Sequence, residues 1–333
     1  MTHVVGKNVP ESDRETNPHQ DSFFFPEQKA ITHPETFAMA SNLLSSQTRD
    51  KQAQLFRSYV SAYEAGSGVK IQKISGAYLR RVLKPIEDAR DDERAAGRDP
   101  QGLRITPALI PAEHRQDALY RALYDTDTTF SECKKAEVDM LSSFEVMAKL
   151  WTEHRASSMA HVLLAWKISE GSTNMRLVGA ITVCKSYEDE DIGTHRNLMS
   201  PGDFDKLKPI FRANTLLIDC LCSTSPGVGT ALVLNAIKLA LTKKCRYVTC
   251  LSFSKNQLKE GAKPASYKLL QRLGFKIIIP KAHFVRRIYG AWCALDLKDD
   301  ALPFGGLMEK VVNVCARGGL TPRTSEVLVN RCP

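Results

Sequence analysis

Long hydrophobic runs are missing from this sequence. None of its 333 residues lies in an apolar stretch of the roughly 20 residues that a membrane-spanning helix needs. The first residues also lack the charged and then apolar layout of a secretory signal. We therefore expect an intracellular, cytoplasmic protein with no membrane contact, and its 43% hydrophobic residues suffice for a sizeable core.

A disulfide framework and a metal motif are also missing. The nine cysteines are odd in number and lie mostly inside apolar segments. Such a distribution is typical of buried free thiols in a reducing compartment. Cys220 and Cys222 are separated by a single residue, which is too close for the usual pair of zinc ligands. We therefore expect no metal site.

Positive charge is unevenly distributed along the chain. The net charge is +9, and residues 238–287 hold 13 Lys and Arg against the single acid Glu260. This range either meets an anionic ligand or forms a solvated basic face. Its few aromatic side chains lie at core-like positions, so stacking on bases is not expected and nucleic acid is not a predicted partner. They are Tyr247, Phe253, Tyr267, Phe275 and Phe284.

Composition divides the chain into four parts. Residues 1–30 are polar and rich in proline, which predicts a disordered arm, and 299–333 form a C-terminal tail. Residues 31–102 predict a helical N-terminal extension, with a capping box from Thr32 to Glu35 and a later helix that Pro85 interrupts.

Residues 103–298 predict one α/β domain. Two amphipathic helical stretches come first, and the runs 159–168 and 176–187 around a polar turn then predict an antiparallel hairpin. A strand over 214–224 follows, and after it helices and strands alternate to a closing strand. This order is typical of a mixed sheet with helices on both faces, in the α/β (α+β) class.

Two glycines, Gly227 and Gly229, follow the strand over 214–224 and precede a helix. At such a turn, unpaired backbone N–H groups meet the positive end of the helix dipole and can bind phosphate. The pattern matches neither a P-loop nor a dinucleotide fingerprint. A tight turn without any ligand is the alternative interpretation.

Four segments in this order resemble the GNAT superfamily of acyl-CoA N-acyltransferases. They are "LVGAITV" at 177–183, "LLIDCLC" at 216–222, "PGVGTAL" at 226–232 and "ASYKLLQRLGF" at 265–275. The resemblance covers about 103–298, and the ordered set is far more specific than any one segment.

The resemblance implies acetyl-CoA as the acyl donor. In this family the strand before the turn parts from its neighbour, and the pantetheine arm pairs with its backbone. Here that edge corresponds to Leu221 and Cys222. The turn cradles the pyrophosphate, and its counterpart is Thr224, Ser225, Pro226, Gly227, Val228, Gly229 and Thr230.

The turn departs from the family pattern at its first position. Thr224 stands where the family usually has Gln or Arg. Basic residues further on, including Lys243 and Lys244, are an alternative source of charge for the adenosine 3′-phosphate. Lys255 and Lys263 belong to the same set.

The resemblance also implies a base and an acid for acyl transfer. Asp219 is the candidate base, because it interrupts an apolar strand, although it could equally cap a loop or pair with an Arg. Strict alternation would put Leu217 on the same face as Asp219, and Ile218 and Cys220 on the other.

The family's acid is often a tyrosine four residues before the Gly-Phe pair, where this chain has Leu270. Tyr267 lies one turn earlier, within about 60° of the same helix face, and is the candidate acid. Its alternative role is packing, and Cys222 and Ser223 are weaker substitutes as acids.

These features predict an acetyl-CoA-dependent N-acetyltransferase acting on an amine of a protein or a small molecule. The alternative is a non-catalytic protein of the same fold, in which coenzyme A binding is weak or lost. In that case the N-terminal extension would bind a protein partner.

Overall fold

The computed structural model describes residues 49–100, 103–124, 140–153, 160–168, 175–185, 200–253, 265–284 and 288–297. The predicted arm over 1–30 and tail over 299–333 lie outside these ranges. Within them, no helix combines the length and the apolar character needed to cross a bilayer.

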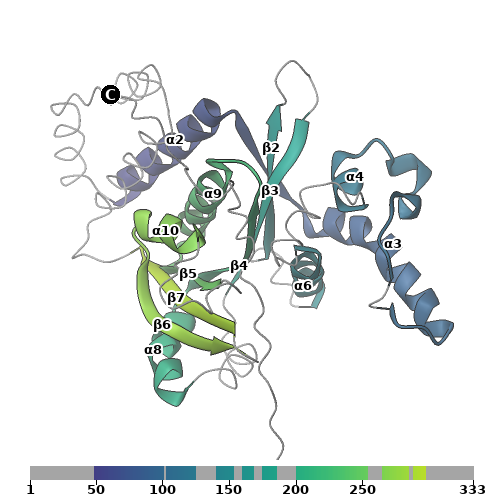
Figure 1. Ribbon diagram of the computed structural model, residues 1–333. Helices are drawn as coiled ribbons and strands as arrows, with labels where there is room; N and C mark the ends of the chain where they lie inside the picture. The colour runs from purple at the N-terminus through teal and green to yellow at the C-terminus, as the bar shows by residue number, and fades with distance from the viewer. Residues whose placement is uncertain are drawn as a thin grey trace, which may run out of the picture.

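Seven strands form one mixed sheet in the order β1-β2-β3-β4-β5-β7-β6 (Figure 1). Only β4 and β5 are parallel, and α9 connects them, as a parallel pair requires a crossover. The predicted hairpin is confirmed as β2 and β3. The strands are β1 (Val69–Ile74), β2 (His161–Ile168), β3 (Met175–Lys185), β4 (Thr215–Ser223), β5 (Tyr247–Phe253), β6 (Lys276–Phe284) and β7 (Ile288–Asp296).

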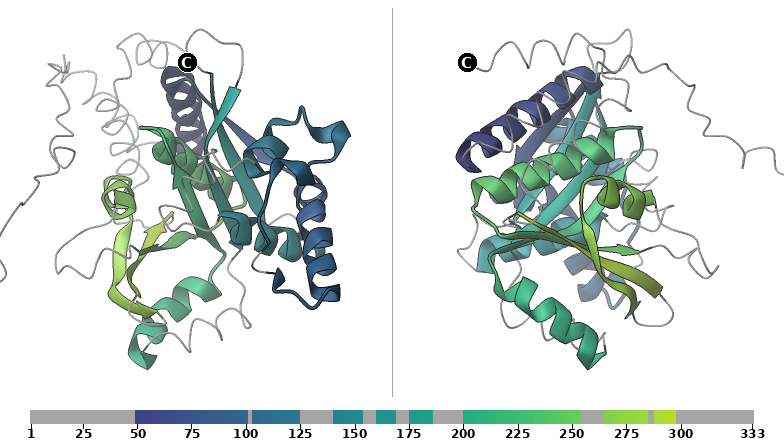
Figure 2. Two further views of the ribbon diagram at one scale, coloured as in Figure 1. Left: turned by 45° about the vertical axis from the view of Figure 1, so that its right-hand side comes forward. Right: turned by 90° about the vertical axis from the view of Figure 1, so that its left-hand side faces the viewer.

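Helices cover both faces of the sheet, which confirms the predicted fold class. One core cluster packs α2, α9 and α10 on one face, a second packs α3, α4 and α6 on the other, and a smaller third lies under α8 (Figures 1 and 2). The helices are α2 (Arg49–Ser67), α3 (Gly76–Ala95), α4 (Ala118–Tyr124), α6 (Met140–Glu153), α8 (Pro201–Arg212), α9 (Val228–Thr242) and α10 (Ala265–Arg272). Two 3₁₀ turns, Pro107–Leu109 and Ala112–His114, precede α4.

The sheet begins earlier in the chain than residue 103. Strand β1 pairs with β2 along its whole length, and α2 before it packs against α9. The expectation of helices alone over 31–102 is therefore wrong at Val69–Ile74. The short strand lies at the edge of the sheet, where lysines such as Lys70 and Lys73 oppose further pairing.

Helix α3 is continuous through Pro85, so the predicted interruption is wrong. Proline lacks the N–H that would bond the carbonyl four residues earlier, which is that of Arg81. The hydroxyl of Tyr120 donates to this carbonyl at 2.9 Å and replaces the missing donor.

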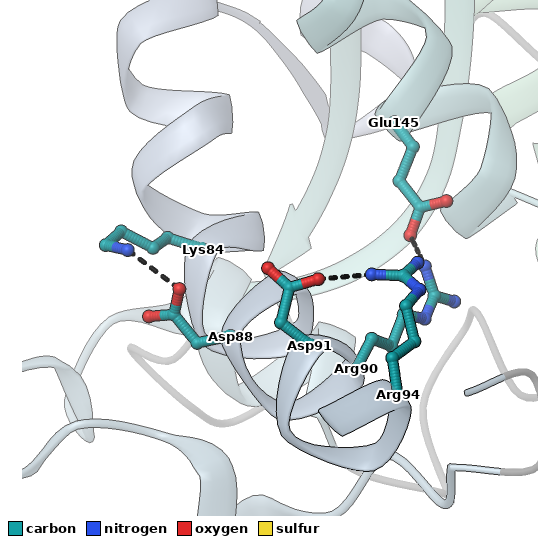
Figure 3. A network of polar contacts seen from close by, with 6 residues as sticks. All are labelled: Lys84, Asp88, Arg90, Asp91, Arg94 and Glu145. Carbon is teal, nitrogen blue, oxygen red and sulfur yellow. Dashed lines mark hydrogen bonds and ion pairs between the residues drawn. The ribbon is translucent and has the colours of Figure 1, made fainter. Parts of the chain in front are cut away.

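Charged side chains help to join α3 to α6. Figure 3 shows Arg90 of α3 paired with Glu145 of α6, whereas Lys84 pairs with Asp88 within α3. Arg94 and Asp91 form a second pair within α3. The partly buried Arg90–Glu145 pair therefore connects the two helices on this face of the sheet.

Candidate active site

Strands β4 and β5 part in the middle of the sheet. They pair over four positions, from Thr215 opposite Tyr247 to Ile218 opposite Cys250. Beyond that pair β4 continues to Ser223 and β5 to Phe253, but the two strands no longer pair with each other. The parting that the resemblance implies is therefore present, and the stretch 219–223 lies along it.

Helix α10 lies beside this parting. The hydroxyls of Ser252 on β5 and Ser266 on α10 are 2.8 Å apart and form a hydrogen bond. Leu269 of α10 approaches the first turn of α9, since a Cβ added at Gly229 would be 3.6 Å from its Cδ2. The parting is therefore surrounded by the ends of β4 and β5, by α10 and by the start of α9.

A β-bulge places Asp219 where the strands part. Thr182 of β3 pairs with Cys220 and the next residue, Val183, pairs with Ile218, so Asp219 is the extra residue. A bulge interrupts the alternation of side chains. Cys220 packs with the cluster under α3 and α6, on the same face as Leu217, so the prediction that it shares the face of Ile218 is wrong.

The carboxylate of Asp219 accepts hydrogen bonds from two hydroxyls. Ser143 on α6 donates to its Oδ2 at 2.5 Å, and Thr182 on β3 donates to the same oxygen at 3.4 Å. Ser143 and Thr182 are buried, and since the Ser143 proton points to Asp219, the single hydroxyl proton of Thr182 is shared between Ser143 Oγ and Asp219 Oδ2. Asp219 itself is exposed, so its carboxylate is held on one side and open to solvent on the other. Hydroxyls therefore hold it, in place of the loop cap or arginine partner considered from the sequence.

Sequence reasoning did not identify Ser143 and Thr182. The sequence does contain a signal for Ser143, because this serine lies among Met140, Phe144 and Met147 on the apolar face of its helix. A serine on such a face must find an acceptor inside the protein.

The turn after β4 is tied to β3. The backbone N–H of Thr224 donates to the carbonyl of Val178 at 2.9 Å, and its hydroxyl donates to the same oxygen at 3.2 Å. Gly179 allows this close approach, because a Cβ there would lie 2.7 Å from the carbonyl oxygen of Cys222. Both donors of Thr224 thus serve to anchor the turn.

Gly227 ends the turn in the left-handed conformation, with φ of 81°, and forms the N-cap of α9. The next residue, Val228, is fully buried, as expected of a side chain that anchors the turn. Its N–H bonds to the carbonyl of Ser225 at 3.3 Å, and Pro226 has no N–H to offer.

The first turn of α9 supplies backbone donors. The N–H groups of Gly229 and Thr230 lie in that first turn, where helix geometry provides no carbonyl acceptor. A Cβ at Gly229 would lie 3.2 Å from Ser223 Oγ, so a side chain there would fill the space between the end of β4 and the helix. An anion at this point would meet both donors and the positive end of the dipole.

Tyr267 lies on α10 with its ring in the core. It is 9% exposed and belongs to the same cluster as Leu270 and Leu273, so Tyr267 and Leu270 do share a helix face. The ring therefore packs, as the alternative interpretation held, and the role of its hydroxyl as an acid stays a prediction.

Cys222 departs from the expectation of free thiols. Cys245, Cys250 and Cys293 carry free thiols, whereas Cys222 forms a disulfide. A cysteine in a disulfide lacks the thiol proton that an acid needs. Cys222 is therefore excluded as a substitute acid.

Lys243 and Lys244 lie too far away to contact a phosphate at the turn. They follow the last residue of α9, a helix of 15 residues that spans about 22 Å. Helix geometry puts them at the opposite end of α9 from the turn, and their role toward the adenosine 3′-phosphate stays a prediction. Lys255 and Lys263 lie outside the described residues.

In the part of the chain that the structure describes, no three side chains of His, Cys, Asp or Glu come together as metal ligands would.

Neither the family models nor the curated proteins include a match to this chain. Solved structures are similar at low identity. The yncA protein of Salmonella typhimurium, determined with its cofactor acetyl-CoA, is 16% identical over 71% of this chain and 98% of its own, with a TM-score of 0.33. The polyamine N-acetyltransferase of Drosophila melanogaster is 11% identical over 68% of this chain and 99% of its own, also with 0.33.

A third similar structure is the NatC complex bound to Gag peptide and CoA. It is 15% identical, covers 51% of this chain and 91% of its own, and has a TM-score of 0.32. Likeness at this level carries no argument about activity. The mixed sheet, the parting of β4 from β5 and the glycine turn before α9 are the features that the resemblance to the GNAT acyl-CoA N-acyltransferases leads us to expect.

Proposed function

We propose that the protein is an acetyl-CoA-dependent N-acetyltransferase that acts on an amine of a protein or a small molecule. The observation that carries the proposal is the parting of β4 from β5 next to the glycine turn at the start of α9. A sheet gains nothing in stability from an opened pair of strands, because backbone groups buried without partners destabilise the fold. An extended ligand with an anionic end accounts for both features together.

The residues present fit coenzyme A. The N–H groups of Gly229 and Thr230 would bind the pyrophosphate, in the space that a Cβ at Gly229 would fill. The backbone of Leu221 and Cys222 lies along the parting and would pair with the pantetheine arm. Thr224, Ser225, Pro226, Gly227 and Val228 would hold the turn in shape.

Acyl transfer to an amine needs a base for the amine and an acid for the departing thiolate. Asp219 is the base we propose, because its exposed carboxylate lies where the strands part and is oriented by Ser143. Tyr267 is the acid we propose, since its phenol lies on α10, the helix beside the parting, and a phenol can give a proton to a departing thiolate. The substrate supplies the activated acyl group.

Calorimetric titration with acetyl-CoA and with free coenzyme A tests the proposal. The parent protein should bind both, and Gly229→Val should abolish binding because its side chain occupies the phosphate position. Gly202→Val is the matched control. Gly202 also lies in the first turn of a helix, α8, with open space around its Cβ position, and its variant should bind as the parent does. A parent that binds neither ligand, or a Gly229→Val variant that binds normally, contradicts the proposal.

One observation favours a second candidate, a non-catalytic protein of this fold. Leu270 stands where the family often has its tyrosine acid. Its side chain is 3% exposed and packs in the core, so this position supplies no hydroxyl. Under that interpretation coenzyme A binds weakly or not at all, and the N-terminal range recruits a protein partner. Tight binding of acetyl-CoA followed by turnover with any amine excludes it.

A further inference from the structure

Helix α2 contacts the turn that we assign to the pyrophosphate. It lies before the sheet in sequence and beside α9 in space, as both views in Figure 2 show. The hydroxyl of Tyr63 on α2 donates to the carbonyl of Gly227 at 3.0 Å, across 164 residues of sequence. A helix outside the four segments of the family resemblance therefore reaches the proposed binding turn.

The carbonyl of Gly227 is a sensitive point of that turn. Glycine has more backbone freedom than any other residue, and Gly227 is left-handed, so its own conformation is weakly restrained. Its carbonyl also accepts from the N–H of Ala231 at 3.0 Å, which closes the first turn of α9. Because a peptide unit is planar, whatever holds this carbonyl also sets the direction of the Val228 N–H, which bonds to Ser225 and so fixes the turn just before the donors of Gly229 and Thr230.

The side chain of Tyr63 is well fixed to hold the Gly227 carbonyl in position. Its side chain is 4% exposed and packs in the same cluster as Val228. A buried hydroxyl keeps its hydrogen-bond partner, because leaving either group unsatisfied destabilises the fold. A Cβ at Gly227 would lie 3.0 Å from this hydroxyl, so the tyrosine also opposes any side chain at that position.

A second contact fixes the crossing of the two helices. Glu64 accepts from Asn235 Nδ2 at 2.6 Å, and the same amide donates to the carbonyl of Ala231 at 2.9 Å. Consecutive residues of α2 thus reach α9 at its N-cap and two turns further along. Of these two contacts, only that of Tyr63 reaches the turn between β4 and α9. A variant of Glu64 is therefore a suitable control.

We propose that Tyr63 is a positioning residue for the pyrophosphate of coenzyme A, acting through the carbonyl of Gly227. The inference rests on the proposed function and adds α2 to the binding site. Tyr63 contacts the turn and not the ligand, which the backbone N–H groups of Gly229 and Thr230 would bind.

The experiment compares the full-length parent with Tyr63→Phe and Glu64→Ala. Each variant removes one hydrogen bond between α2 and α9, and phenylalanine keeps the packed ring. Tyr63→Phe should weaken coenzyme A binding about five- to tenfold, the effect of one lost hydrogen bond, and Glu64→Ala should leave it unchanged. Pantetheine, which lacks the pyrophosphate, should bind the parent and Tyr63→Phe equally.

Hydrogen exchange on the ligand-free proteins gives a second readout. The amide of Ala231, which bonds to the Gly227 carbonyl, should exchange faster in Tyr63→Phe than in Glu64→Ala, while both variants melt within a few degrees of the parent. Equal coenzyme A affinity in parent and Tyr63→Phe overturns the inference and leaves the proposed function intact. The inference is also overturned if Glu64→Ala weakens coenzyme A binding as much as Tyr63→Phe does. The same holds if Tyr63→Phe weakens pantetheine binding as much as coenzyme A binding. A parent that does not bind coenzyme A removes the proposed function and this inference together.

Discussion

Ser143 on α6 donates its hydroxyl to Asp219 on β4 at 2.5 Å, at the point where the bulge of β4 begins the parting from β5. A carboxylate fixed on one side and exposed on the other is suited to accept a proton from an incoming group. This relationship leads to the first prediction.

Asp219→Asn should lower turnover about 10²- to 10⁴-fold, the range for loss of a general base. Ser143→Ala keeps the carboxylate but releases its orientation, so its effect on turnover should be smaller, and neither variant should change the affinity for acetyl-CoA. Steady-state kinetics and calorimetry on the same samples check both. Full turnover in Asp219→Asn would show that the carboxylate only holds α6 to the sheet.

Tyr267→Phe tests the proposed acid. The variant keeps the ring in its core cluster and removes only the hydroxyl. Turnover should fall about 10²- to 10⁴-fold with acetyl-CoA affinity intact, because a departing thiolate would lose its proton donor. Parental turnover would assign the proton to water and leave Tyr267 a packing residue.

Pro85 and Tyr120 should be energetically coupled. The hydroxyl of Tyr120 satisfies the Arg81 carbonyl that Pro85 deprives of a helical donor. Tyr120→Phe should therefore destabilise the parent by about 1 to 3 kcal/mol, the effect of a buried carbonyl without a donor.

The same substitution made together with Pro85→Ala should destabilise much less, because the restored N–H of residue 85 reaches the carbonyl of Arg81. Urea unfolding of the parent, both single variants and the double variant measures this coupling. Additive changes in the free energy of unfolding would show that the hydroxyl and the proline act independently.

Local signals explain which parts of the fold were predictable. The β2–β3 hairpin has two continuous apolar runs around a polar turn, and β4, the turn and α9 combine an apolar strand with Gly227 and a long apolar helix. Each of these depends on residues close together in sequence, so propensity and turn chemistry suffice.

Other features depend on contacts that no local pattern contains. Strand β1 carries polar residues at 70, 72 and 73, because it lies at the edge of the sheet, and so it shows little of the apolar run of an inner strand. The bulge at Asp219 is set by its register against β3. The contact of Tyr63 with Gly227 joins residues that are 164 positions apart in the sequence. For these features the tertiary partner decides, and a single sequence does not show it.

The last prediction concerns alkaline pH. Tyr124 is 1% exposed and donates its hydroxyl to the carbonyl of Val82 at 2.9 Å. Burial, and then the neighbouring Tyr120, raise the pKa of Tyr124 well above its ordinary value of 10.0. The unfolded chain therefore loses this proton first as the pH rises. The stability from the neutral phenol is fully present below about pH 10, and it decreases as the pH rises from there toward the higher pKa of the folded state.

Above about pH 10, the free energy of unfolding of the parent should fall more steeply than that of Tyr124→Phe, by about 1.4 kcal/mol per pH unit. The partly buried Tyr78 has a raised pKa in both proteins, so its contribution cancels in the difference. The variant should be the less stable protein at neutral pH, because the Val82 carbonyl loses its donor, and the gap should narrow as the pH rises. Urea unfolding at a series of pH values from about 8.5 to 11 measures both curves. Parallel curves would mean that the hydroxyl of Tyr124 ionises equally easily in the folded and unfolded states, and that its burial has no effect on its titration.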